Sequence, residues 1–203
     1  MERARNYGAG RSGLTEDICT VARIAYADID SQETKALASE ITAQRGSVLH
    51  LYRMLLHSPP VAAGWLRYLT AIRHECSLPG ALRELVIMRV ALLNGAPYEA
   101  DQHAPVARAE GLSEAQLDEL PAWGSSELFG AKQRAVLAFT DAMTREVRVR
   151  DSAFANVRAH LDERSIVELA ATVGAYNMVS RFLEALQIHT DDVVGSAGPA
   201  AHD

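Results

Sequence analysis

The 203-residue sequence predicts an all-α protein, built as a helical bundle. Apolar residues recur every three or four positions through most of the chain, which is the period of a helix that buries one face. Glycines and prolines interrupt this period at intervals suited to helix ends. No segment shows the alternation of apolar and polar residues that is typical of a half-buried strand.

The first half of the chain predicts four helices separated by proline or glycine. Ser31 can cap the first of them, and Gly46 follows its end. Prolines at 59, 60 and 79 separate the others, because proline lacks the amide hydrogen that a helix interior requires. The fourth helix is apolar on all sides and is therefore expected to be buried. The predicted ranges are 31–44, 50–57, 61–75 and 81–94.

The second half predicts five more helices. Gly95 and Pro97 suit the end of one helix and the first turn of the next. Ser113 to Gln116 resembles a capping box, and residues 123–130 are expected to form a loop. The long final segment keeps apolar residues at helical spacing throughout. The predicted ranges are 97–110, 113–121, 131–145, 151–160 and 162–188.

The length suits a single domain, expected at residues 14–193 between disordered tails at 1–13 and 194–203. The 26 acidic and 20 basic residues give a net charge of −6, which disfavours nucleic acid as a partner. No apolar run could span a membrane, and residues 1–13 lack the apolar core of a secretory signal. Cys19 and Cys76 form no CxxC pair, as in proteins of reducing compartments. We therefore expect a cytoplasmic protein.

Chemistry-bearing residues concentrate between positions 83 and 103. Glu84 lies on the apolar helix before Gly95, and Tyr98, Glu99 and His103 lie on the helix after it. Glu99 and His103 are four residues apart and share one helix face. Histidine titrates near neutral pH, and a neighbouring carboxylate can orient it or exchange charge with it. The cluster is therefore a candidate acid–base site, with Tyr98 as a hydrogen-bond donor to an oxyanion.

Structural explanations compete with this interpretation. Glu84 could form a solvated ion pair with Arg83 or Arg89, and a core histidine is often only hydrogen-bonded. Glu99 and His103 could also hold two corners of a metal site, but one pair is too few ligands, and we expect no metal. A buried carboxylate with a raised pKa could act as acid or base, and Glu84 is a candidate for this role.

The segments RELVIMRVALLNG and PYEADQHAPVARAEGL, from Arg83 to Leu112, resemble the carboxymuconolactone decarboxylase family, which includes the alkylhydroperoxidase-D-like proteins. The closing segment VGAYNMVSRFLEAL, from Val173, adds to this resemblance. It covers roughly residues 48–188 and implies an all-α bundle assembled as a homotrimer or homohexamer. One subgroup of the family reads Tyr-Glu-Trp-x-x-His, whereas this chain has Ala100 in place of the tryptophan.

The thiol peroxidase branch of that family uses a glutamate, a CxxC pair and a histidine. Glu84 and His103 match the glutamate and the histidine, but Ala96 and Glu99 occupy the cysteine positions. Peroxide reduction by this route needs a thiolate and a resolving thiol, so that activity should be absent. The chain therefore resembles the branch without CxxC.

The resemblance implies a carboxy-lyase that acts without a cofactor on a small molecule such as 4-carboxymuconolactone. Loss of CO₂ from this lactone leaves charge that its own carbonyl accepts. His103, Glu84 and Glu99 would supply acid–base catalysis, and Tyr98, Ala96 and Ala100 would contact substrate. Arg181 could anchor a substrate carboxylate through its guanidinium. Two alternatives stay open: an antioxidant peroxidase, and a helical oligomer that binds a ligand without turnover.

Overall fold

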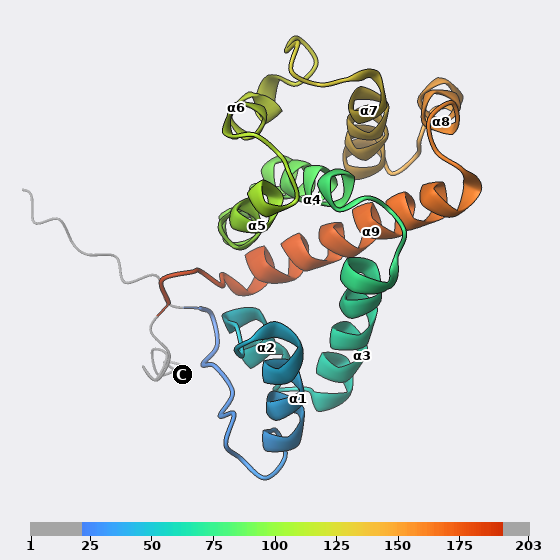
Figure 1. Cartoon of the computed structure of the whole chain (residues 1–203). Coiled ribbons are helices and arrows are strands. Elements are labelled where there is room, and N and C mark those ends of the chain that lie inside the picture. Colours follow the sequence, from blue (N-terminus) through green and yellow to red (C-terminus); the bar gives the residue numbers. More distant parts are fainter. Residues whose placement is uncertain (1–21, 193–203) are drawn as a thin grey trace, which may run out of the picture.

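A computed structural model describes residues 22–192, and these residues form helices and connecting loops with no strand among them (Figure 1). The predicted tails at 1–13 and 194–203 lie outside the described residues, as do both predicted domain boundaries. The elements are α1 (Lys35–Arg45), α2 (His50–Leu55), α3 (Pro59–Thr70), a π-helical turn η1 (Ala71–Glu75), α4 (Gly80–Asn94), α5 (Pro97–Ala109), α6 (Glu114–Glu119), a 3₁₀ turn η2 (Leu120–Ala122), α7 (Ala131–Glu146), α8 (Asp151–Arg158) and α9 (Glu163–Leu186). The all-α prediction is confirmed for this part of the chain.

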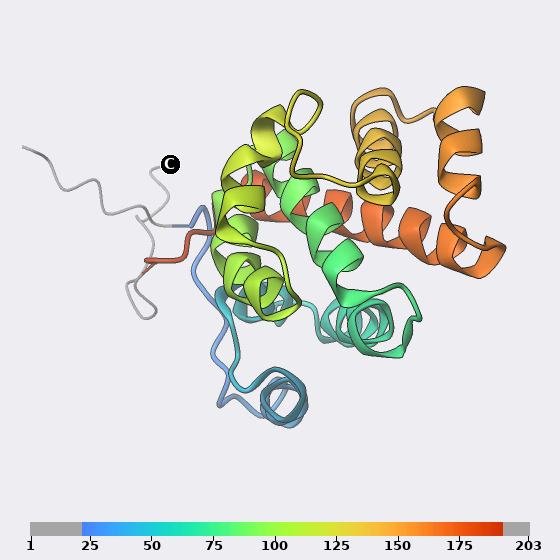
Figure 2. The same cartoon turned by 45° about the horizontal axis from the view of Figure 1, so that its top comes forward.

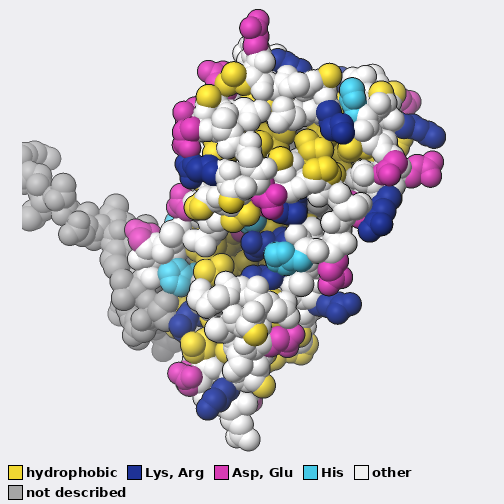
Figure 3. Space-filling model, viewed as in Figure 1, with side chains coloured by type: hydrophobic (Ala, Val, Ile, Leu, Met, Phe, Trp, Pro, Cys, Tyr) yellow, Lys and Arg dark blue, Asp and Glu magenta, His cyan; other side chains and the backbone are white. Residues whose placement is uncertain are grey.

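Two helices, α4 and α9, form the centre of the structure. α4 packs against α5, α7 and α9, and α9 also contacts α7, α8 and the turn η1. Helices α4 to α8 gather on one side of α9, and α1 to α3 form the opposite end of the molecule (Figures 1 and 2). Between these groups the surface is hollowed, and basic and histidine side chains gather in the hollow (Figure 3).

The core follows from apolar residues of the two central helices. Leu85, Val86 and Ile87 of α4 are fully buried, as consecutive positions can be only in a helix covered on most sides. The prediction for this helix fails at its carboxyl end, where Leu92 is 43% exposed. There Leu92 lines an open apolar groove between α4, α5 and α6.

The helix boundaries agree with the predicted ones except at the start of α1. Thr34 stands at the amino cap, and the Ser31 side chain accepts a hydrogen bond from the Thr34 amide at 3.3 Å. Ser31 thus belongs to a turn before the helix and does not cap it. Ser113 and Gln116 form the expected capping box of α6. Within the described residues, no helix is long and apolar enough to cross a membrane.

Glu168 of α9 fixes the segment that joins η1 to α4. Its carboxylate accepts hydrogen bonds from the amides of Ser77 and Leu78, each at 2.8 Å, and from the Ser77 hydroxyl at 2.9 Å. Arg164 donates to the other oxygen at 2.9 Å. Glu168 is only 8% exposed, so these bonds replace water around its charge.

Replacing Glu168 with alanine should therefore destabilise the protein by about 1–3 kcal/mol, because the buried Leu78 amide loses its acceptor. Burial raises the Glu168 pKa, but the hydrogen bonds from Arg164, Ser77 and Leu78 outweigh it and lower the pKa overall. The stabilisation is then complete above about pH 4.3, the unfolded value, and declines as pH falls through the folded pKa. Urea unfolding of the wild type and of Glu168→Ala at a series of pH values above and below about 4.3 measures the difference in their free energies of unfolding.

Glu184→Ala, on an exposed part of the same helix, is the matched control and should unfold like the wild type. If the difference in unfolding free energy between the wild type and Glu168→Ala stays constant as pH falls below about 4, the ionised Glu168 carboxylate is not the source of the stabilisation.

Candidate active site

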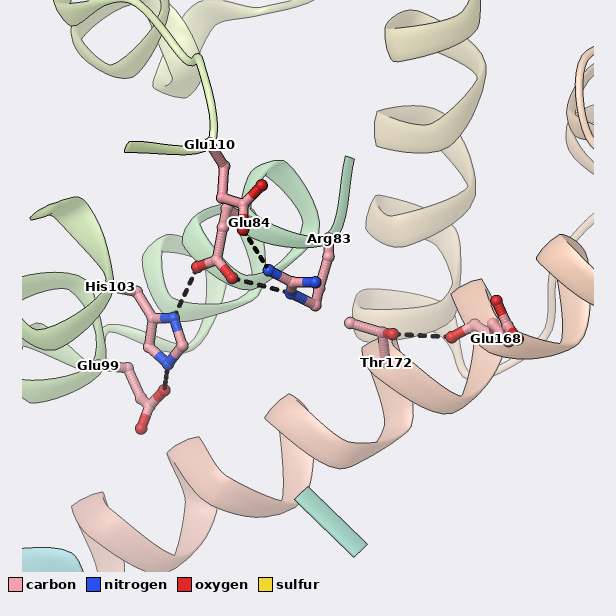
Figure 4. Close-up of polar contacts among 7 residues, drawn as sticks. All are labelled: Arg83, Glu84, Glu99, His103, Glu110, Glu168 and Thr172. Carbon is pink, nitrogen blue, oxygen red and sulfur yellow. Dashed lines mark hydrogen bonds and ion pairs between the residues drawn. The ribbon is translucent and has the colours of Figure 1, made fainter. Parts of the chain in front are cut away.

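Helices α4 and α5 place one imidazole between two carboxylates (Figure 4). His103 Nδ1 lies 2.7 Å from Glu84 Oε2, and His103 Nε2 lies 3.5 Å from Glu99 Oε2. The left-handed backbone of Gly95, with φ +63°, ends α4, and Pro97 opens α5. This turn folds α5 back so that its Glu99–His103 face meets Glu84. The predicted shared face of Glu99 and His103 is confirmed.

Glu84 is fully buried and bonded on both oxygens. Arg83 Nε lies 3.0 Å from Glu84 Oε1, while Arg83 also reaches Glu110 at 3.0 Å. Burial raises the pKa of Glu84, but the hydrogen bonds and positive charges of His103 and Arg83 lower it overall. Glu84 is therefore not a buried carboxylate with a raised pKa. The contact with Arg83 is present, but it is a buried ion pair and not a solvated one.

Glu99 has the opposite electrostatics. It is 4% exposed, and its Oε2 has no hydrogen-bond partner among the described residues. Burial raises the pKa of Glu99, and the charge of Glu84 adds to this, against smaller opposing effects from His103 and Arg73. One imidazole thus stands between two carboxyl groups whose pKa values are shifted in opposite directions, that of Glu84 lowered and that of Glu99 raised. Such divergence separates acid and base roles in known active sites.

A cavity of about 270 Å³ opens beside this cluster, between α1, α2, the end of α3, α5 and α9. Its volume suits a small molecule. Glu84 lies behind the imidazole and does not line it. The lining residues are Gln44, Arg45, Leu49, Leu51, Tyr52, Leu69, Arg73, His74, Tyr98, Glu99, Gln102, His103 and Tyr176.

Tyr98 and Tyr176 are two of the three tyrosines that line this cavity; the third is Tyr52. Tyr98 was expected here; its oxygen accepts the Leu51 amide at 3.5 Å, and burial raises its pKa to about 12. Tyr176 lies on α9, within the predicted helix at 162–188, and the sequence did not single it out as a site residue. Its ring meets the His103 ring edge-on at 5.1 Å, and its buried hydroxyl has no hydrogen-bond partner among residues 22–192. A buried tyrosine hydroxyl usually has a hydrogen-bond partner, and here none of the described residues supplies one.

Three of the predicted substrate contacts lie elsewhere. Ala96 and Ala100 line the separate apolar groove beside Leu92, because position 100 points about 100° away from Glu99 around the helix. Arg181 is exposed and donates to the Asn177 carbonyl, one turn earlier on α9, at 3.1 Å. The cavity arginines are instead Arg45 and Arg73, which the sequence did not single out.

No three His, Cys, Asp or Glu side chains within residues 22–192 converge in a way that could hold a metal ion. Cys76 is a free, partly buried thiol whose pKa is raised by burial and by the charge of Glu168. Cys19 lies outside the described residues.

Comparison with known proteins supports the resemblance seen in the sequence. The model of the carboxymuconolactone decarboxylase family matches residues 59–142, which include Glu84, Glu99 and His103. The uncharacterized protein YdfG of Bacillus subtilis is 29% identical over 109 residues, which make up 53% of this chain and 74% of YdfG.

Two solved structures share the fold. One, described as an alkylhydroperoxidase AhpD core and an uncharacterized peroxidase-related protein from Ralstonia eutropha JMP134, has a TM-score of 0.72 and 16% identity, over 86% of this chain and 98% of that one. The other is the debrominase Bmp8 in complex with 2,3,4-tribromopyrrole, with a TM-score of 0.70 and 15% identity, over 83% of this chain and 90% of that one. Residues 59–142 thus match the carboxymuconolactone decarboxylase family model, and the chain shares the fold of the AhpD core.

Proposed function

We propose that the protein is a cofactor-free lyase or isomerase that uses acid–base catalysis on a small carbonyl- or lactone-containing acid. A carboxy-lyase of the 4-carboxymuconolactone decarboxylase type is the specific form. The observation that supports this best is the placement of His103 between Glu84, whose pKa is lowered, and Glu99, whose pKa is raised, at a small cavity. The substrate's own conjugated carbonyl can accept the electron pair that such a reaction releases.

Each side chain then has a distinct task. Glu84 accepts the Nδ1 hydrogen of His103 and leaves Nε2 facing Glu99 and the cavity. In a decarboxylation the bond to CO₂ breaks, its electron pair enters the conjugated carbonyl, and Glu99 or His103 then delivers a proton to carbon. Water restores that proton after the product leaves.

The tyrosines suit stabilisation of the oxyanion. Burial raises the pKa values of Tyr98 and Tyr176, so both hydroxyls keep their hydrogens at neutral pH. The Tyr176 hydroxyl, unpartnered within the described structure, is available to donate to the carbonyl oxygen on which charge develops. Donors already fixed in place before reaction need no rearrangement as that charge forms.

Replacing Glu99 with glutamine should lower kcat by about 10²- to 10⁴-fold, because the amide has the same shape but no proton to transfer. The KM should change little. Asp101→Asn, the same change at an exposed site of α5, is the control and should retain wild-type turnover. Full turnover by Glu99→Gln would show that Glu99 transfers no proton and only positions the imidazole of His103.

A screen of lactone acids, keto acids and enones, read by mass spectrometry with CO₂ detection, tests the reaction class. A product formed with CO₂ indicates a decarboxylase, and a rearranged product without CO₂ indicates an isomerase. Ligand-induced stabilisation without turnover on any candidate would favour a binding protein. A coupled thiol-peroxide assay tests the antioxidant alternative, which we expect to fail because Ala96 and Glu99 replace the CxxC cysteines.

We further expect this enzyme to act in the cytoplasm as a homotrimer or homohexamer. Apolar side chains exposed on α8 and α9 suit such an assembly: Phe154 is 41% exposed and Val167 is 67% exposed. Sedimentation of the purified protein measures the number of subunits.

A further inference from the structure

Two arginines line the same cavity as Glu99 and His103, yet neither forms an ion pair with any described residue. Arg45 comes from the end of α1, and Arg73 comes from the π-helical turn η1. Both are partly buried. Of the four other buried or partly buried arginines among the described residues, Arg83 pairs with Glu84 and Arg89 with Asp141, whereas Arg53 and Arg134 form no ion pair. A partly buried guanidinium without a counter-charge is costly unless a bound anion supplies one.

Neutral groups hold Arg45 in place. Its Nη2 donates to the Thr70 hydroxyl at 2.7 Å, its Nε donates to the Tyr52 hydroxyl at 3.4 Å, and Thr70 in turn donates to Gln44 at 2.7 Å. These contacts fix the direction of the guanidinium but leave its charge uncompensated. The side chain is thus organised for a ligand before the ligand arrives.

The backbone around Arg73 has an unusual conformation. In η1 the Cys76 amide donates to the Ala71 carbonyl at 3.1 Å, five residues back, and π-helical turns are frequent at functional sites. Glu168 then fixes the two residues after Cys76. The turn is therefore firmly held while it directs Arg73 to the cavity.

The acidic groups at this site leave the two charges free. Glu84 is already bonded to Arg83 and His103, and Glu99, whose pKa is raised by burial, lies 3.5 Å from His103 and forms an ion pair with neither arginine. His74 also lines the cavity, and burial together with the charges of Arg73 and Arg45 lowers its pKa. The hollow in Figure 3 is thus locally positive on a protein whose net charge is −6.

We propose that Arg45 and Arg73 each bind one acidic group of the same ligand, so that this cavity selects small dicarboxylates. A guanidinium binds a carboxylate through two parallel hydrogen bonds, which gives geometric selection as well as charge. With both carboxylates held, the ligand's carbonyl region lies towards His103, Glu99 and Tyr176. The inference relies on the proposed function only in treating this cavity as the active site.

Isothermal titration calorimetry with matched pairs of acids tests the selection. Succinate, glutarate and adipate are compared with butyrate, valerate and hexanoate, which have a terminal methyl in place of the second carboxylate. The best dicarboxylate should bind about 10- to 100-fold more tightly than its partner. Equal affinities within every pair, or no binding of any acid at millimolar concentration, would overturn the proposal.

Variants assign the effect to the two arginines. Arg73→Gln and Arg45→Gln should each reduce the dicarboxylate to the affinity of the monocarboxylate, and Arg73→Lys should retain part of the preference. Arg67→Gln, at an exposed position of α3 outside the cavity, should change nothing. Thermal melts check that each variant folds. An unchanged preference in folded Arg73→Gln or Arg45→Gln would reject the assignment.

Titration with inorganic phosphate distinguishes a site that binds two separate acidic groups from a site that binds one doubly charged group. Phosphate binding as tight as that of the best dicarboxylate would overturn the two-carboxylate arrangement. Equilibrium binding needs no turnover, so the outcome is independent of the proposed reaction. A dicarboxylate preference without any turnover would reject the catalysis alone, and turnover without dependence on either arginine would reject this inference alone.

Discussion

Replacing His103 with alanine is expected to lower turnover of the substrate by about 10²- to 10⁴-fold, the usual contribution of a positioned acid–base group. The imidazole is the only group that contacts both carboxylates within the described structure, at 2.7 Å from Glu84 and 3.5 Å from Glu99. Its loss breaks the connection between them and removes one of the two groups that can deliver a proton to the substrate carbon. Steady-state kinetics on the substrate found in the screen measures the effect.

Two further measurements separate chemistry from folding. His160→Ala, at an exposed position just after α8, should keep wild-type kinetics. Added imidazole should partly restore His103→Ala, because a small base can enter the space that the side chain leaves. Wild-type turnover in a folded His103→Ala variant would remove this residue from the mechanism.

The largest loss of stability is expected from Arg89→Ala. Arg89 is 4% exposed and joins α4 to α7 through two hydrogen bonds to Asp141, at 2.7 and 2.6 Å. It also donates to the Leu120 carbonyl at 3.0 Å. Removing one member of a buried pair costs about 3–5 kcal/mol, and we expect the lower end because Arg145 remains 3.7 Å from Asp141.

Arg108→Ala is a well-matched control for this prediction. Arg108 bonds Glu114 through the same two-point geometry, at 2.6 and 2.8 Å, but the side chains are 47% and 61% exposed. Solvent screens such a pair, so its loss should shift the urea midpoint far less than loss of Arg89. Equal shifts for both variants would show that burial does not determine the strength of the Arg89 pair.

The secondary structure was largely predictable because its signals are local. Gly95 and Pro97 mark the turn between α4 and α5, and the capping box marks the start of α6. The start of α1 was misplaced because a serine before a turn and a serine at a helix cap look alike in sequence. The exposure of Leu92 depends on how α4, α5 and α6 pack together, which periodicity does not determine.

The candidate site was predictable only in part, for the same reason. Glu99 and His103 share a face through helix geometry alone, whereas Glu84 was assigned to them through the family resemblance. The opposite pKa shifts of the two glutamates depend on the hydrogen bonds from His103 and Arg83, which lower the pKa of Glu84 and have no counterpart at Glu99. Arg181 was chosen for its chemistry, but its position on α9 directs it away from the cavity.

The missed residues come from distant parts of the chain. Arg45, Arg73 and Tyr176 meet at one cavity only because α1, η1 and α9 pack together. A single sequence contains no local signal for that meeting. The π-helical turn departs from the α-helical period, so the pattern of apolar residues does not predict it. The one available signal was Tyr176, a hydroxyl group within an otherwise apolar stripe.

Turnover in D₂O, followed by mass spectrometry of the product, tests acid–base catalysis at His103 most directly. Proton delivery to carbon predicts a product with one solvent-derived deuterium, formed by the wild type and strongly reduced in His103→Ala and Glu99→Gln. A product that carries no solvent deuterium, or equal product formation by the wild type and His103→Ala, would contradict proton transfer at this site.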